Sequence, residues 1–240
     1  MERNLKVSLL LCCFIVCMST GFGQTEAQKL LIESSRYHDP NGLWEKSKVE
    51  IKLNEVRPGY PDRKTELMIN NKTGRFVMHQ IREGHEISFD IKGDKCKIKF
   101  DGSTPHDTVA IKKFNLTPNR ARVIRDYYTY LYGLPMRLLR DGSIPDEQVT
   151  TSRFNGSSAL TVRVTYPPNL GSDIWYFYFN PQSKQLVGYR FYHDEEKNDG
   201  EYIILENEVS IGRLILPQDR SWYTNNGDEL LGSDRIILED

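Results

Sequence analysis

Alternation of apolar and polar side chains dominates the chain between Trp44 and Phe100. Val49, Ile51 and Leu53 are separated by charged and polar residues. The same pattern returns at residues 95–100, where lysines alternate with apolar residues: Lys95, Lys97 and Lys99 with Cys96, Ile98 and Phe100. A period of two places successive side chains on opposite faces of a strand. The region is therefore expected to form half-buried antiparallel strands.

Two segments switch to helical spacing. The first covers about residues 26–37 and aligns small or apolar residues on one face: Ala27, Leu30, Leu31 and Ser34. The second has clear ends, with Thr117 as N-cap, Pro118 at the first helical position and Gly133 as the stop. Its apolar residues also recur at helical spacing: Ala121, Ile124, Tyr128 and Leu131. We predict helices over 26–37 and 118–132, each with one side on a sheet.

Short strand-like segments separated by turn residues resume after residue 148: Val149–Phe154, Leu160–Tyr166, Ile174–Phe179, Leu186–His193, Tyr202–Val209, Ile211–Leu216 and Arg235–Leu238. About ten consecutive antiparallel strands twist too strongly to remain a flat open sheet. We therefore expect a mainly β protein, with residues 24–240 forming a single domain. Its predicted architecture is one curved antiparallel sheet forming an unclosed barrel, with the N-terminal helix and the inserted helix covering the open face.

Residues 1–23 have the features of a secretion signal. Arg3 and Lys6 supply the positive start, Val7–Met18 is an apolar run, and small residues at 21 and 23 form a cleavage site. The apolar run is too short to span a bilayer stably, so no transmembrane segment is expected. The mature chain is expected to begin at Gln24, outside the cytoplasm.

Cysteine usage refines the expected compartment. Cys96 is the single cysteine beyond the signal, so the mature chain contains no intramolecular disulfide. Leu11 and Val16 precede Cys12 and Cys17, where a lipid-modified cysteine would need a small neighbour, so we expect a protein without a lipid anchor. Stability without a disulfide favours a bacterial envelope, periplasmic or extracellular, over a eukaryotic extracellular space.

Charge excludes one class of partner. The chain carries 32 basic and 33 acidic residues, for a net charge of −1. This balance gives no electrostatic reason to bind nucleic acid or an anionic membrane surface. Nothing in the pattern fixes the oligomeric state, and a monomer is our expectation.

The most suggestive binding feature is the aromatic strand at 174–179. Both of its faces are apolar, because Trp175, Phe177 and Phe179 share one parity while Ile174, Tyr176 and Tyr178 share the other. Each face therefore needs cover from a helix, a partner or a ligand. A packed core and an apolar groove are both consistent with this pattern. The groove hypothesis assigns six lining residues without deciding the parity: Trp175, Tyr176, Phe177, Tyr178, Tyr189 and Phe191.

Candidate catalytic and metal-binding residues are sparse. No complete catalytic, metal-binding or phosphate-loop motif occurs, so no catalytic residue, metal ligand or cofactor is assigned. An enzyme remains an alternative if the fold joins two His-Asp pairs, His38-Asp39 and His193-Asp194, into a hydrolytic or sugar-directed site. A protein-interaction scaffold that uses the lysine-rich strand at 95–99 is a further alternative.

The other histidines and the cysteine have simpler interpretations. A two-residue turn at Glu83-Gly84 predicts a hairpin that pairs His79 with Ser88 and His85 with Arg82. In this register the two histidines lie on opposite faces and cannot share a metal ion. Cys96 lies on an apolar strand face, which predicts a buried, inert thiol.

An acidic loop at 194–201 places five carboxylates within eight residues. It does not match the EF-hand pattern, because Asp199 and Leu205 stand where Gly and Glu are required. A solvated hairpin loop and a weak calcium site remain the two interpretations of this segment.

Four long segments carry a family resemblance: residues 36–44 (RYHDPNGLW), 125–135 (RDYYTYLYGLP), 171–181 (GSDIWYFYFNP) and 188–202 (GYRFYHDEEKNDGEY). Together they resemble a family of uncharacterised secreted proteins of Bacteroidota-type bacteria. The overall plan is similar to the LolA-like periplasmic lipoprotein-carrier fold, an unclosed antiparallel barrel with helices over an apolar concave face. This resemblance implies binding of a lipid, an acyl chain or a lipoprotein-like partner, and it implies no catalytic residue, because fold alone does not determine function.

Overall fold

The computed structural model describes residues 23–140 and 142–238. The predicted signal lies outside this range except for Gly23. Three α-helices and two 3-10 helices are present in the described residues: α1 (Glu26–His38), η1 (Trp44–Lys46), α2 (Thr108–Phe114), α3 (Pro118–Gly133) and η2 (Glu195–Lys197). The strands are β1 (Lys48–Arg57), β2 (Tyr60–Asn70), β3 (Arg75–Arg82), β4 (His85–Lys92), β5 (Lys95–Phe100), β6 (Ile144–Pro145), β7 (Thr150–Phe154), β8 (Ser157–Thr165), β9 (Ile174–Phe179), β10 (Leu186–Tyr192), β11 (Glu201–Ile211), β12 (Leu214–Thr224) and β13 (Leu230–Ile237).

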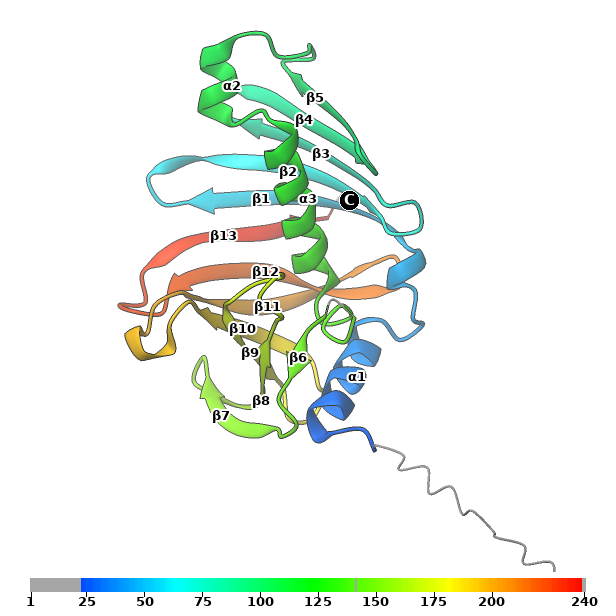
Figure 1. The fold of residues 1–240 in the computed structure, drawn as a ribbon, viewed down its shortest axis with the longest axis vertical. Coiled ribbons are helices and arrows are strands. Elements are labelled where there is room, and N and C mark those ends of the chain that lie inside the picture. The colour runs from blue at the N-terminus through cyan, green and yellow to red at the C-terminus, as the bar shows by residue number, and fades with distance from the viewer. Residues whose placement is uncertain (1–22, 141, 239–240) are drawn as a thin grey trace, which may run out of the picture.

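All described strands belong to one antiparallel sheet that does not close. The order is β5-β4-β3-β2-β1-β13-β12-β11-β10-β9-β8-β6, with β7 also paired to β8. Two successions of neighbouring strands, β1 to β5 and β8 to β13, therefore meet where β1 pairs with β13 (Figure 1). The predicted mainly β, unclosed antiparallel architecture is confirmed.

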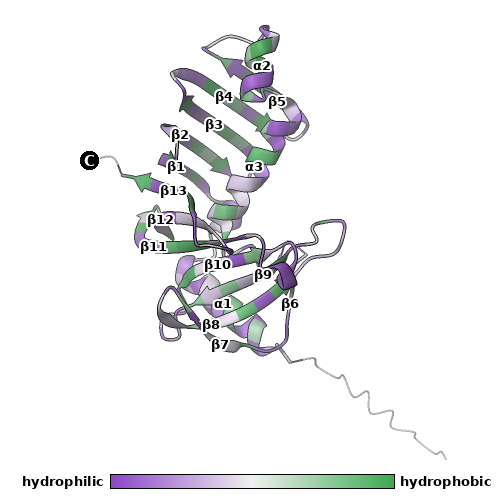
Figure 2. Cartoon of the chain, turned by 90° about the vertical axis from the view of Figure 1, so that its left-hand side faces the viewer, coloured by the Kyte–Doolittle hydropathy of each residue, from purple (hydrophilic) through white to green (hydrophobic). Residues whose placement is uncertain are grey.

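One face of the sheet, here called the inner face, is covered by α1 and α3. Figure 1 shows α3 crossing in front of the strands, with α1 beside the β6–β9 end. Figure 2 shows that the sheet changes orientation strongly between β1–β5 and β8–β10. The two predicted helices thus occupy the positions expected for covers of the open face.

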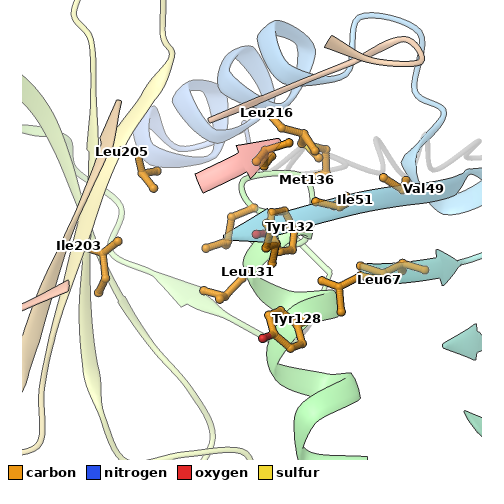
Figure 3. Packing of buried hydrophobic residues seen from close by; sticks show 14 of the residues in the cluster. Val49, Ile51, Leu67, Tyr128, Leu131, Tyr132, Met136, Ile203, Leu205 and Leu216 are labelled. Carbon is orange, nitrogen blue, oxygen red and sulfur yellow. The ribbon is translucent and has the colours of Figure 1, made fainter. Parts of the chain in front are cut away.

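A large apolar core fills the space between these helices and the inner face. From α3, Ala121, Tyr128 and Leu131 are buried, as their spacing predicts, and Tyr132 is fully buried beside them. Figure 3 shows Tyr132 close to Ile51 of β1, with Ile203 of β11 further across the core. The core therefore includes strands from both successions.

Local signals explain the ends of both helices. Thr25 accepts a hydrogen bond from the Gln28 N–H, and the Gln28 side chain returns one to the Thr25 N–H, which forms a capping box. Thr117 accepts from the Arg120 N–H at the start of α3, where Pro118 follows as predicted. These side chains satisfy N–H groups that the first helical turn leaves without carbonyl partners.

Two features differ from the sequence expectation. Residues 211–216 do not form a strand of their own, because β11 ends at Ile211 and β12 begins at Leu214, with Gly212 in the turn at φ +62°. A glycine tolerates this left-handed conformation, so the segment makes a hairpin turn. The short helix α2 was not predicted; Asp107 caps it by accepting from the Val109 N–H.

Candidate functional site

The candidate site is a cavity of about 480 Å³ between α3 and the inner face of the sheet. We call it the aromatic cavity. Its lining comes from α3 and from the strands β9 to β13, together with charged residues at its rim: Tyr127, Tyr130 and Leu131; Trp175, Tyr189, Phe191, Ile203, Trp222, Leu231 and Gly232; Arg57, Asp173, His193 and Glu201. Several of the apolar side chains remain partly exposed, including Tyr127 at 42% and Leu231 at 37%.

Aromatic rings stack along the floor of this cavity. The Trp175 ring lies 4.9 Å from that of Phe191 at an interplanar angle of 34°. Tyr130 of α3 meets Trp175 edge-on at 6.0 Å, and its hydroxyl lies 2.9 Å from that of Tyr166. Such offset and edge-to-face arrangements hold the rings in fixed positions. The cavity therefore offers a preformed apolar surface.

The strand register decides which predicted residues reach the cavity. Trp175 pairs with Phe191 and Phe177 pairs with Tyr189, so these four share the inner face. Trp175, Tyr189 and Phe191 line the cavity, whereas Phe177 is 0% exposed and packs in the core.

Tyr176 and Tyr178 point to the other side of the sheet and do not line the aromatic cavity. Tyr178 belongs to a small second cluster with Phe154 and Ala159, and its ring stacks on Phe154 at 4.1 Å. Gly188 permits this contact, because a Cβ there would lie 2.2 Å from the Phe154 ring. The β7–β8 hairpin thus supplies Phe154 as cover for the second aromatic face.

Three residues of α3 line the cavity although the sequence analysis did not assign them to it. Tyr127, Tyr130 and Leu131 follow the three- and four-residue spacing of one helix face. This spacing is the sequence feature from which their common face could have been predicted. Leu131 also belongs to the buried face predicted for this helix, so the same helix both closes the core and forms one wall of the cavity.

Charged groups gather at the cavity rim. The His193 Nδ1 lies 2.8 Å from an Asp173 carboxylate oxygen, and this contact raises the pKa of His193. Partial burial raises the pKa of Glu201. Arg57 is anchored to Asp234 at 2.9 Å and stacks its guanidinium over Trp222 at 5.4 Å. The cavity is apolar inside and polar at its opening.

His38 is a structural residue. It is 0% exposed, its Nδ1 lies 2.8 Å from the Ile215 carbonyl, and its Nε2 accepts the Leu186 N–H at 3.0 Å. Because a carbonyl only accepts, Nδ1 carries the proton and the ring is neutral. Burial lowers its pKa to about 4. Both ring nitrogens are occupied, which leaves neither for acid–base chemistry.

The two His-Asp pairs occupy separate places. Asp39 accepts hydrogen bonds from the Leu43 and Trp44 N–H groups and borders a cavity at the end of α1. His193 lines the aromatic cavity, while Asp194 caps η2 and pairs with Lys197 at 2.8 Å. The structure therefore does not assemble the four residues into one site.

The acidic loop uses its carboxylates locally. Asp199 accepts from the His193 and Asp194 N–H groups, and Glu195 contacts Tyr176 and Arg163. Within residues 23–140 and 142–238, no group of three or more His, Cys, Asp or Glu side chains is arranged to hold a metal ion.

The β3–β4 hairpin follows its predicted register. His79 pairs with Ser88 and His85 with Arg82, so the two histidines lie on opposite faces. Cys96 is half-buried rather than fully buried, and burial raises the pKa of its thiol, as expected of an unreactive cysteine. Its strand, β5, ends the sheet and exposes Lys95, Lys97 and Lys99, a common protection of an edge strand against pairing with another chain.

Comparison with known proteins places this fold. The chain matches over residues 5–240 a family described as "Family of unknown function (DUF6503)". It belongs to the DUF6503 family. No functionally curated protein matches this family member.

Solved structures resemble this DUF6503 chain at low sequence identity. A LolA superfamily protein from Nitrosomonas europaea has a TM-score of 0.51 at 9% identity, over 91% of this chain and 95% of that one. A putative outer membrane lipoprotein-sorting protein domain from Vibrio parahaemolyticus has a TM-score of 0.48 at 8% identity, over 88% and 92%. A DUF1329 family protein from Desulfovibrio piger has a TM-score of 0.48 at 9% identity, over 87% and 89%. The first of these likenesses shows a LolA-like fold.

No helix within the part of the DUF6503 chain that the structure describes is both long and apolar enough to cross a membrane.

Proposed function

We propose that this protein is an exported carrier that binds the apolar part of a lipid, an acyl chain or a lipoprotein-like partner in the aromatic cavity. The observation that carries the proposal is the cavity itself: about 480 Å³ of space with Trp175, Tyr189 and Phe191 on one wall and α3 on the other. Its place on the inner face of a LolA-like sheet supports the same function.

The energetics favour an apolar ligand. Tyr127 and Leu231 expose 42% and 37% of their surfaces beside the half-buried rings of Trp175 and Phe191. Removing apolar area from water contributes about 25 cal/mol per Å². A ligand that buries roughly 300 Å² would gain several kcal/mol before the costs of association.

Export is part of the proposal. The charged start, apolar run and small cleavage residues of 1–23 support release into a bacterial periplasm or the extracellular space. N-terminal sequencing of the exported protein should begin at Gln24, and a retained Met1 would contradict export with cleavage.

Saturable binding of N-phenyl-1-naphthylamine, a dye that fluoresces in apolar surroundings, tests the carrier function. We expect the wild-type protein to bind the dye and dodecanol to displace it. Trp175→Glu and Phe191→Glu should each weaken binding at least tenfold, because both place a charge in the cavity.

Tyr192→Glu is the matched control. Tyr192 follows Phe191 along β10 but belongs to the opposite face, where its ring meets Tyr176. This variant should bind the dye within twofold of wild type. Equal losses in the inner-face and outer-face variants, or no saturable binding in the folded wild type, would reject the carrier proposal.

A further inference from the structure

A second cavity, of about 260 Å³, adjoins the aromatic cavity on the inner face. The two share Arg57 and Tyr127 in their linings. Besides Arg57, its lining contains three more arginines, Arg63, Arg82 and Arg120. We call it the arginine cavity. It faces β1 to β4, whereas the aromatic cavity faces β9 to β13.

Three neighbouring strands build this cavity with the same order of side chains. On the inner face each strand runs from an apolar residue through a polar one to an arginine: Leu53-Glu55-Arg57 on β1, Leu67-Thr65-Arg63 on β2, and Met78-Gln80-Arg82 on β3. Register brings the polar and arginine positions side by side, because Thr65 pairs with Gln80 and Glu55 pairs with Arg63. Alternation then places the arginines together at one edge of the inner face.

The single carboxylate that lines this cavity is already bound by neighbouring side chains. Glu55 is 2% exposed; its Oε1 accepts from the Tyr128 hydroxyl at 2.7 Å. Its Oε2 accepts from the Thr65 hydroxyl at 2.5 Å and from the Gln80 amide at 3.1 Å. Glu55 is thus held within the wall of the cavity.

Positive charge is left over after the ion pairs are assigned. Arg57 pairs with Asp234, and Arg82 lies 3.4 Å from Glu83, a carboxylate that Lys113 also contacts at 2.8 Å. The Arg82 Nε, the atom that lies 3.4 Å from Glu83, is buried and meets no hydrogen-bond geometry there. The guanidinium groups of Arg63 and Arg120 have no hydrogen-bond or ion-pair partner among the described residues.

The start of α3 adds to the positive potential. Arg120 lies in its first turn, and that turn contains no acidic residue. The N-terminus of a helix carries a partial positive charge, which is commonly balanced by Asp or Glu. Here the same end presents another cation to the cavity.

We propose that the arginine cavity binds the oxyanion head group of an amphiphile, a phosphate or carboxylate, while the apolar part of the same molecule occupies the aromatic cavity. This inference rests on the proposed carrier function and narrows its ligand to an anionic lipid. Guanidinium groups bind phosphate and carboxylate oxygens through paired N–H donors. The Arg57 and Tyr127 side chains that both cavities share mark the point where chain and head group join.

The test compares three probes on the full mature protein by displacement of N-phenyl-1-naphthylamine and by calorimetry. Dodecyl phosphate contains both chemistries, dodecanol contains the chain alone, and inorganic phosphate contains the anion alone. We expect dodecyl phosphate to bind at least tenfold more tightly than dodecanol. Inorganic phosphate should bind weakly and leave the dye in place.

The double variant Arg63→Gln/Arg120→Gln should weaken dodecyl phosphate at least tenfold and change dodecanol less than twofold. The matched control, Lys72→Gln/Arg213→Gln, removes the same net charge at two exposed positions outside the arginine cavity. It should change neither affinity by more than twofold.

Three outcomes would overturn the inference. Equal affinity of wild type for dodecanol and dodecyl phosphate would remove the head-group site and leave the carrier function intact. Phosphate that binds as tightly as dodecyl phosphate would assign the cavity to a free anion. Failure of dodecanol and dodecyl phosphate alike would reject the carrier function itself.

Discussion

The inner faces of β1–β4 and of β9–β12 belong to one sheet and lie under one helix, yet they end in different chemistry. The first passes from apolar residues to Glu55 and then to arginines. The second continues as aromatic residues up to the rim of its cavity, where Asp173 and His193 stand. The comparison shows that one continuous sheet can present two adjoining environments. This arrangement fits the amphiphile proposed above, which has an apolar chain and an anionic head group.

The largest expected effects test whether both halves share one cooperative core. Phe89 on β4 is 2% exposed and Phe177 on β9 is 0% exposed. Replacing either by alanine leaves a cavity in a packed interior, which typically costs about 3–5 kcal/mol. We expect both variants to lose this much in urea unfolding.

The three tryptophans allow a sharper measurement. Trp44, Trp175 and Trp222 all lie outside β2–β5, so tryptophan fluorescence does not directly report the unfolding of these strands. Circular dichroism must therefore be used to follow them. Coincident fluorescence and dichroism transitions in both variants would support one cooperative unit. Phe177→Leu should lose less than Phe177→Ala. A Phe89→Ala variant that changes only the dichroism transition would show that the halves unfold separately.

A second prediction contrasts buried titratable groups by their pH dependence. His38 packs against β10 and β12, on the side of the sheet that carries the aromatic cavity. Its pKa in the folded protein is about 4, below its ordinary value of 6.5. The unfolded chain therefore binds a proton more readily, and stability falls as the pH falls from about 6.5 to 4. The loss amounts to roughly 3 kcal/mol. His38→Gln should be less stable at neutral pH but should lack this component of the pH profile.

Asp234 should act in the opposite direction. Burial, followed by the nearby Glu55 carboxylate, raises its pKa to about 6, while Arg57 and Arg220 oppose the shift. The folded state therefore takes up a proton before the unfolded state does. Stability gained from this group increases as the pH falls from above 6 toward 4.

Urea unfolding of Asp234→Asn between pH 4 and 7.5 measures this contribution. The variant should lose stability on acidification more steeply than wild type, because the stability that wild type gains from protonation of Asp234 is absent. A profile parallel to that of wild type would show that Asp234 does not change its protonation in this range.

Local sequence signals were sufficient for α1, α3 and the β3–β4 hairpin. Thr117 and Pro118 define where α3 begins, and Glu83 and Gly84 adopt the positive φ values, 53° and 78°, that a two-residue hairpin turn needs. Each of these outcomes depends on residues within a few positions of one another. These elements could therefore be predicted from short stretches of sequence.

Long-range features were harder to predict. Strand β9 is apolar on both faces, so its pattern could not show that Trp175 faces the cavity and Tyr176 faces away. The seven residues of α2 are too few for a clear periodicity. In contrast, Arg57, Arg63 and Arg82 lie on the faces of their strands that are otherwise buried. A charged residue at a position where the alternation predicts an apolar one can be recognised from the sequence. Such conflicts are common at functional sites.

The pairing of β1 with β13 has a consequence for folding kinetics. Residues 52–56 pair with residues 233–237, so the centre of the sheet depends on contacts between residues 177 to 185 positions apart in the sequence. High contact order slows folding, because a long loop must close before its contacts form. The β1–β5 strands can assemble early from local hairpins, but β1 then presents an unpaired edge until β13 arrives. During that interval the edge is open to other chains, and we expect folding to benefit from a chaperone that shields it.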